Sequence, residues 1–223
     1  MFNPQWRDAL QQFIWAKRQA QPISDSAVKL GFRGWYERGY LPHYDAPNIT
    51  QFVTVMLNDS FPVQRHSEWE AVLAEPDNSV RRQKLEAWLD RGHGNCWLRH
   101  AEVAALILEK LRSATAADYR LQAWVIMPNH VHFVVDVREV PLATLMKRFK
   151  GITAHDANRY LHRNGRFWAP EFFDTWVRDE QELRRRIHYV EYNPVKAFFT
   201  ADPREWKWSS ALHRDACGRL QGL

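Results

Sequence analysis

The stretch that most constrains the fold is Trp124-Val-Ile-Met-Pro-Asn-His-Val-His-Phe-Val-Val-Asp136. Two apolar runs flank a Pro-Asn break, and the second run opens with His130 and His132. Residues two apart in a strand point to the same face, so the two imidazoles would lie side by side, with Val131 facing a core. Two imidazoles on one strand could form half of a divalent-metal site. A solvated polar strand face remains the alternative.

The remaining periodicities predict a strand, helix, strand, strand, helix, strand, helix order. The strands are expected at 48–58, 119–127, 130–137 and 172–177, and the helices at 99–112, 141–161 and 181–192. The short connection at residues 128–129 makes its two strands antiparallel neighbours. The last helix should end near Asn193, because a residue before proline disfavours the α region. This order matches an α+β ferredoxin-like sandwich, a central antiparallel sheet with helices on one face.

Three segments extend this core. We expect an N-terminal arm over 1–47, a main domain over 48–212 and a C-terminal tail over 213–223. The arm could begin with an amphipathic helix over 4–18. A helical insertion at about 64–94 interrupts the main domain, and Ser67 is the expected N-cap of its first helix.

Residues 31–45 are dense in glycine, arginine and aromatic residues, which predicts an irregular loop. Arg33 and Arg38, with their aromatic neighbours, could stack on bases and pair with phosphates. The alternative is an arm that packs onto the domain through its aromatic side chains.

The composition favours a polyanionic partner and argues against a membrane. The formal net charge is +5 and 45% of the residues are hydrophobic, enough for a sizeable core. No apolar run approaches the 18 or so residues that span a bilayer. Cys96 and Cys217 lack metal-binding spacing, which indicates a reducing, cytosolic setting.

The helix at 181–192 carries two tyrosines. At about 100° per residue, Tyr189 and Asn193 lie at the edge of its apolar stripe, one turn apart, whereas Tyr192 lies opposite the stripe. Tyr189 is therefore the better candidate to reach the histidine strand, and Tyr192 is the runner-up. An interfacial tyrosine with its hydroxyl in water is the alternative.

Basic residues recur around these elements. Candidate DNA contacts are Lys147, Arg148, Lys150, Arg166, Arg184 and Arg185, with Trp168 as a stacking surface beside Arg166. Because acidic residues lie nearby in the sequence, an ordinary solvated face is the alternative for any one of them.

Two ordered motifs resemble a known family. Met127-Pro-Asn-His-Val-His-Phe-Val-Val135, followed by Tyr189-Val-Glu-Tyr-Asn-Pro-Val-Lys196, resembles the one-tyrosine transposases of the His-hydrophobe-His class, and most closely the REP-associated tyrosine transposases. The resemblance covers roughly residues 34–212, with support from Arg38-Gly-Tyr-Leu-Pro-His-Tyr-Asp45, Phe167-Trp168 and Trp206-Lys-Trp-Ser-Ser210.

The resemblance implies a metal-dependent reaction on DNA. His130, His132 and Asn193 would hold Mg²⁺ or Mn²⁺, and this ligand set favours Mn²⁺ in affinity. Tyr189 would attack a backbone phosphorus of single-stranded DNA at a REP-like hairpin. The products would be a 5′-phosphotyrosine and a free 3′-OH, which can later rejoin strands.

The resemblance also implies the setting and the partners. The partner would be single-stranded or hairpin DNA in the bacterial cytoplasm, associated with the nucleoid, and the protein would be a monomer or a homodimer. Two other functions stay open: a non-catalytic regulator that binds hairpin DNA, and a metal-dependent phosphodiester hydrolase that uses water as its nucleophile.

Overall fold

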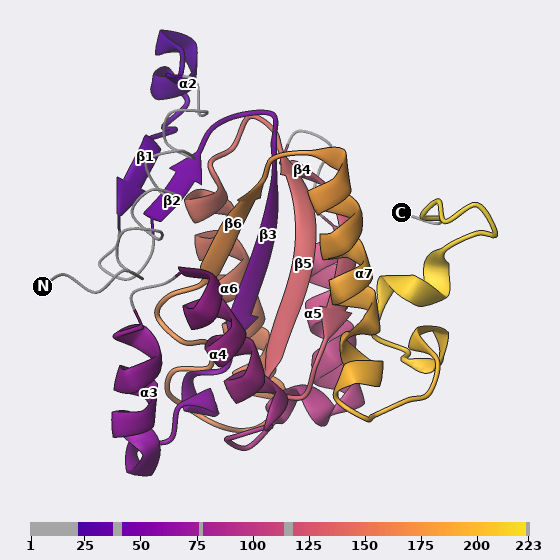
Figure 1. Ribbon diagram of the computed structural model, residues 1–223. Helices are drawn as coiled ribbons and strands as arrows, with labels where there is room; N and C mark the ends of the chain where they lie inside the picture. The colour runs from indigo at the N-terminus through magenta and orange to yellow at the C-terminus, as the bar shows by residue number, and fades with distance from the viewer. Residues whose placement is uncertain (1–21, 38–41, 76–77, 114–117, 222–223) are drawn as a thin grey trace, which may run out of the picture.

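A four-stranded antiparallel sheet forms the centre of the protein. The computed structural model describes residues 22–37, 42–75, 78–113 and 118–221. The sheet consists of β3 (Ile49–Met56), β4 (Tyr119–Ile126), β5 (His130–Val137) and β6 (Phe173–Val177), in the order β4-β5-β3-β6 (Figure 1). This order is that of a ferredoxin-like sheet, and the antiparallel pairing of β4 with β5 confirms the prediction from the Pro-Asn break.

Helices cover both faces of the sheet. On one face, α5 (Ala101–Arg112) and α6 (Leu142–Tyr160) enclose the main core, which includes Val131 and Phe133 of β5 (Figure 1). On the other face, α7 (Glu180–Lys196) packs through Val190 against Val134 and Phe52. The expectation of helices on one face is therefore wrong. The second face also carries buried apolar side chains, among them Phe52, Val125 and Val134, so each face needs a cover.

The last helix runs through its proline. The predicted end near Asn193 is wrong, because α7 continues to Lys196. Pro194 cannot donate the backbone hydrogen bond that would join it to Val190, which weakens the helix at this point. Val190, Asn193 and Pro194 are all buried against the sheet, and this packing stabilises the helical backbone.

Two helices lie between β3 and α5. They are α3 (His66–Leu73) and α4 (Asn78–Asp90), and α4 packs through Leu85 and Leu89 on Met56 of β3. In Figure 1, α4 lies in front of the lower part of β3, on the same face of the sheet as α7. Ser67 is not the N-cap of α3. A 3-10 turn at Val63–Arg65 leads directly into the helix, which places Ser67 inside it.

The described part of the N-terminal arm is ordered. It consists of α2 (Asp25–Lys29) and a two-stranded antiparallel sheet of β1 (Gly34–Glu37) and β2 (Pro42–Asp45), so the expectation of an irregular loop is wrong. Aromatic packing holds it to the sheet edge, since the Tyr44 and Trp176 rings lie 4.8 Å apart. His43 of β2 also pairs with Asp174 of β6, and both are buried. Arg38 and the expected helix over 4–18 lie outside the described residues.

The segment after α7 runs back along β4. The backbone N–H of Ile126 donates to the carbonyl of Trp208 at 3.0 Å, and the indole of Trp206 donates to the carbonyl of Ile126 at 3.0 Å. Short 3-10 turns complete the described chain at Asn58–Ser60, Val63–Arg65, Trp97–Arg99, Pro203–Glu205 and Ser210–His213. Among the described helices, none is both long and apolar enough to cross a membrane.

Trp168 belongs to the core. Its side chain is 3% exposed, and its indole N–H donates to the Thr153 hydroxyl of α6 at 2.8 Å. The backbone of Trp168 bridges to Leu57, just after β3, which carries the ring beneath α6. The prediction that Trp168 stacks on bases is therefore wrong, because its faces are covered by protein.

We predict that Trp168→Ala lowers the free energy of unfolding by about 3–5 kcal/mol, since it leaves a large cavity and removes the hydrogen bond from the indole to Thr153. Urea unfolding measures this change. The control is Ile152→Ala, at an exposed position of α6 beside Thr153. It should change the free energy of unfolding by no more than about 0.5 kcal/mol. A stable Trp168→Ala variant with weakened DNA binding would contradict the assignment.

Candidate metal and nucleophile site

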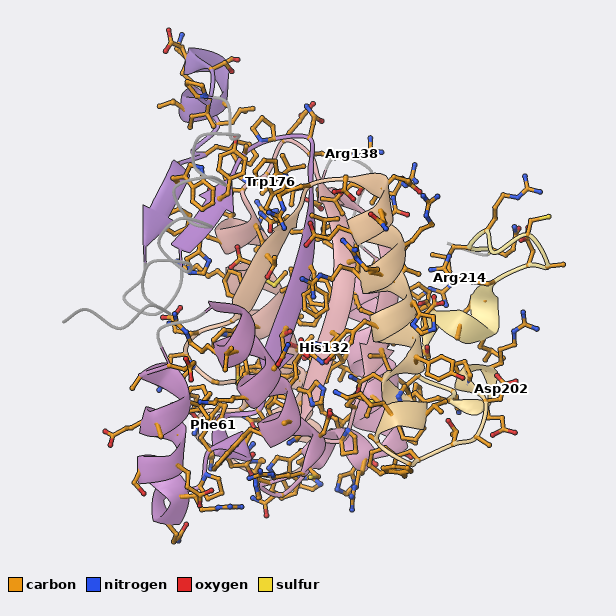
Figure 2. The ribbon with its side chains drawn as sticks, in the orientation of Figure 1. Phe61, His132, Arg138, Trp176, Asp202 and Arg214 are labelled. Atoms are coloured by element: carbon orange, nitrogen blue, oxygen red, sulfur yellow. The ribbon has the colours of Figure 1, made fainter. Side chains whose placement is uncertain are left out.

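His130 and His132 lie side by side on the face of the sheet that α7 covers. Their ring centroids are 4.5 Å apart, and both side chains are fully buried. Figure 2 labels His132 near the centre of this face. The prediction that the two imidazoles share a face is confirmed. The alternative of a solvated polar strand face does not fit their burial.

Each imidazole is held through its Nδ1 atom. Asn129 Nδ2 donates to the carbonyl of Leu89 at 3.2 Å, so its Oδ1 is the acceptor for His130 Nδ1–H at 2.8 Å. The Thr54 hydroxyl hydrogen-bonds His132 Nδ1 at 2.8 Å. When Nδ1 carries the ring proton, Nε2 keeps its lone pair for a metal, as metal-binding histidines commonly do.

Among the described residues, five buried polar atoms of β5 and α7 have no hydrogen-bond partner. They are Nε2 of His130, Nε2 of His132, both side-chain atoms of Asn193, and the hydroxyl of Tyr189. A buried polar atom without a partner costs about 1–3 kcal/mol, so several in one protein call for an explanation. Two imidazole nitrogens and an amide oxygen are suitable ligands for a divalent transition metal.

Burial keeps both histidines neutral. It lowers the pKa of His130 to about 3, and the nearby Lys196 ammonium acts in the same direction. The pKa of His132 lies well below its ordinary value of 6.5, first through burial and then through the neighbouring His130, Lys196 and Arg186. Metal binding requires neutral imidazole, so both side chains are in the competent form at neutral pH.

Of the two tyrosines on α7, Tyr189 is the one that meets the histidines. Its ring lies 5.5 Å from that of His132, and Asn193 is buried one turn further along the helix. Tyr192 is 42% exposed and stacks on His188 at 4.8 Å, on the outer side of the helix. The helical geometry therefore ranked the two tyrosines correctly by position.

The helical insertion places charged groups beside Tyr189. Burial raises the pKa of Tyr189, and the carboxylates of Glu86 and Asp90 on α4 raise it further. Lys196 Nζ bonds to Asp90 Oδ2 at 2.8 Å and lies 5.5 Å from the centre of the Tyr189 ring. None of these three residues was a predicted site residue. The available signal was the four-residue spacing of Glu86 and Asp90, which puts both on one side of a helix.

The predicted DNA-contacting cations do not gather around the histidines. Lys147 and Arg148 are exposed on α6, so the sheet separates them from the site. Arg148 pairs with Asp118 at 3.4 Å, and Lys150 donates to the carbonyls of Ala169 and Pro170 at 2.6 and 2.7 Å.

The other predicted cations lie on the surface of separate elements. Arg184 and Arg185 are exposed on α7, where Arg184 pairs with Glu180 at 3.4 Å. Arg166 is exposed in the loop before β6, and the Arg33 guanidinium lies 5.3 Å from the Tyr36 ring centre in the arm.

The candidate metal site depends on an amide. Within residues 22–37, 42–75, 78–113 and 118–221, no group of three or more His, Cys, Asp or Glu side chains is placed to hold a metal ion. The two histidines therefore need Asn193, or a group from the substrate, to complete a ligand set.

A comparison with protein families identifies the segment that carries this site. The family described as "Transposase IS200 like" matches residues 100–193. This segment includes His130 and His132 of β5 and both Tyr189 and Asn193 of α7. The matched segment is similar to that family and makes up less than half of the chain. The elements α5, β4, β5, α6, β6 and most of α7 lie inside it, whereas β3 and the helical insertion precede it.

Two curated relatives are similar to part of this chain. One, from Haemophilus influenzae, is provisionally named a REP-associated tyrosine transposase and is 29% identical over 101 residues, which cover 40% of this chain and 57% of the relative. The other, a REP-associated tyrosine transposase from Escherichia coli K12, is 26% identical over 104 residues, 46% of this chain and 59% of the relative. The chain thus matches less than two thirds of either relative.

Two solved structures are also similar. A REP-associated tyrosine transposase bound to a REP hairpin is 20% identical, with a TM-score of 0.49 over 84% of this chain and 87% of that one. A transposase-like protein from Deinococcus radiodurans is 14% identical, with a TM-score of 0.30 over 71% of this chain and 96% of that one.

We predict that Thr54→Val lowers the affinity for Mn²⁺ about 10- to 100-fold, because His132 loses the partner that fixes its ring. Calorimetric titration measures the affinity. Thr50→Val is the matched control on the same strand, since Thr50 bonds to Asp136 at 2.7 Å and not to a histidine. Equal losses in both variants would show that the Thr54 bond has no special role.

Proposed function

We propose that this chain is a metal-dependent tyrosine transposase that cleaves and rejoins single-stranded DNA at REP-like hairpins. The observation that carries the proposal is the buried set of unpaired atoms of His130, His132, Asn193 and Tyr189 on one face of the sheet. The relationship to REP-associated tyrosine transposases supports the choice of DNA. Its action on DNA would place the protein with the bacterial nucleoid.

The histidines and Asn193 would hold Mg²⁺ or Mn²⁺. Bound there, such an ion supplies positive charge that polarises a phosphate and offsets the charge of the transition state. The Nδ1 partners Thr54 and Asn129 keep the two rings oriented for this task.

Tyr189 would act as the nucleophile. Its hydroxyl oxygen forms a bond to a backbone phosphorus as the bond from phosphorus to the 3′ oxygen breaks. The phenol gives up its proton, and the leaving 3′ oxygen takes one up, which yields a 5′-phosphotyrosine and a free 3′-OH. Because the pKa of Tyr189 is raised, the phenol needs a proton acceptor.

We predict that Tyr189→Phe abolishes both cleavage and the covalent protein–DNA adduct on a REP-type hairpin oligonucleotide with Mn²⁺, while DNA binding persists. Tyr192→Phe, the matched control on the same helix, should retain both activities. Denaturing gels with a labelled oligonucleotide detect the adduct.

The other results identify the alternatives. Loss of the adduct only in Tyr192→Phe would reverse the nucleophile assignment. Cleavage by Tyr189→Phe would indicate a hydrolase that uses water. A wild-type protein that binds hairpins but never cleaves would indicate a DNA-binding regulator.

Substrate access requires a movement. The Tyr189 hydroxyl and the imidazole Nε2 atoms are buried, so a phosphodiester cannot reach them in this arrangement. The ion pair between Lys196 of α7 and Asp90 of α4 joins the two helices on this face of the sheet. We propose that α4 moves away from α7 when DNA binds, and that a DNA phosphate takes the place of Asp90 beside Lys196.

We predict that Asp90→Asn speeds amide hydrogen exchange in α4 up to about fivefold, because a partly exposed ion pair contributes about 0.2–1 kcal/mol. Lys84→Gln is the matched control, since it removes an ion pair between α4 and Glu75, which lies between α3 and α4, and leaves the Lys196–Asp90 pair intact. Mass spectrometry of exchanged peptides measures the rates. Equal rates in both variants would contradict a role for Lys196–Asp90 in holding α4 closed.

A further inference from the structure

The C-terminal end of α7 has an unusual residue at its cap. The N–H of Phe198 donates to the carbonyl of Val195 at 3.0 Å, and the N–H of Phe199 donates to the carbonyl of Pro194 at 2.9 Å. This is the Schellman pattern, in which the residue at the position of Phe198 adopts a left-handed conformation. Phe198 has φ of 60°, where glycine is the usual residue and a bulky side chain is strained.

The side chain of Phe198 gains nothing from packing. It is 95% exposed, whereas no other large hydrophobic side chain in the described ranges exceeds 54%. Glycine at this position would relieve the backbone strain and remove an apolar surface from water. The stability of the fold therefore disfavours phenylalanine at position 198. A ligand that binds the ring would explain why this residue is present.

The surroundings of Phe198 suit an unpaired base. Phe199 is also exposed, and its ring lies 5.4 Å from that of Trp206. Lys196, two residues earlier, keeps half of its side chain in solvent, and Arg204 and Lys207 are exposed nearby in the sequence. Exposed rings among cations bind single strands by stacking on bases and pairing with phosphates.

The nearby acidic residues are engaged in a local turn. Asp202 accepts the backbone N–H of Arg204 at 2.7 Å, and Glu205 accepts the backbone N–H of Asp202 at 3.4 Å. These carboxylates cap the turn at Pro203–Glu205, so they have a structural role of their own.

We propose that Phe198 is a stacking platform for an unpaired base of the single-stranded part of the DNA substrate. The identity of this ligand rests on the proposed function. Phe198 lies nine residues after Tyr189, just past the end of the same helix and about 13 Å away along its axis, within reach of a strand whose phosphate lies at Tyr189. A second copy of the chain is a poorer fit, because a stable interface buries about 800 Å² on each partner and the exposed rings form a small patch.

Phe198→Gly tests the platform. Fluorescence anisotropy measures binding to a labelled single-stranded oligonucleotide and to its duplex, in EDTA so that no cleavage occurs. We expect the affinity for the single strand to fall about 5- to 100-fold, the loss typical for one stacked base. Affinity for the blunt duplex should stay unchanged, and the melting temperature should stay the same or rise.

Three further variants separate stacking from other effects. Phe198→Trp retains a ring and should keep the affinity for the single strand. Phe198→Asn tolerates the left-handed conformation without an apolar ring and should behave like the glycine variant. Leu212→Ala removes another exposed apolar side chain and should have no effect.

The outcomes distinguish this inference from the proposed function. A Phe198→Gly variant that binds single strands as the wild type does, while Tyr189 still forms its adduct, would overturn the platform alone. A wild type that binds no single-stranded DNA would overturn both. A change of oligomeric state in Phe198→Gly, seen by light scattering without a loss of DNA affinity, would assign the ring to a second copy instead.

Discussion

The two hydrogen bonds to the histidine Nδ1 atoms are the interactions on which the site depends. β5 is buried on both faces, so its polar side chains need partners within the protein. Thr54 and Asn129 provide one partner for each imidazole and leave the two Nε2 atoms without any. The missing hydrogen bond to each Nε2 atom lowers the stability of the fold, but it also leaves the lone pair of that atom available to a metal. The burial that lowers their pKa values keeps them neutral for that purpose.

The helix α7 carries the other candidate site residues and places them beside this strand. One side of it carries Tyr189 and Asn193 against the sheet, and Lys196 joins it to α4 through Asp90. Its capped end then exposes Phe198. A helix that ended before Pro194 would keep Tyr189 and Asn193 but would lose this ion pair and this ring. The last three residues of the helix and the cap that follows them therefore carry the groups that we connect with substrate entry and strand binding.

Local patterns predicted much of the sheet and the ranking of the two tyrosines. The alternation in β5 and the Pro-Asn break are short-range signals, and the position of Tyr189 follows from the 3.6-residue period. The failures have long-range causes. Trp168 is buried because its backbone joins the end of β3, and Pro194 stays helical because the residues beside it pack on the sheet. Glu86 and Asp90 reach the site only because α4 folds back over β3, which no local pattern indicates.

The central claim is that His130, His132 and Asn193 bind one divalent metal beside Tyr189. Anomalous diffraction from crystals soaked in Mn²⁺ tests it most directly. The account predicts a single strong peak within about 2.0–2.3 Å of both imidazole Nε2 atoms and the Asn193 amide oxygen. No peak there, or a peak only elsewhere, such as at the buried His43 and Asp174 pair, would contradict it.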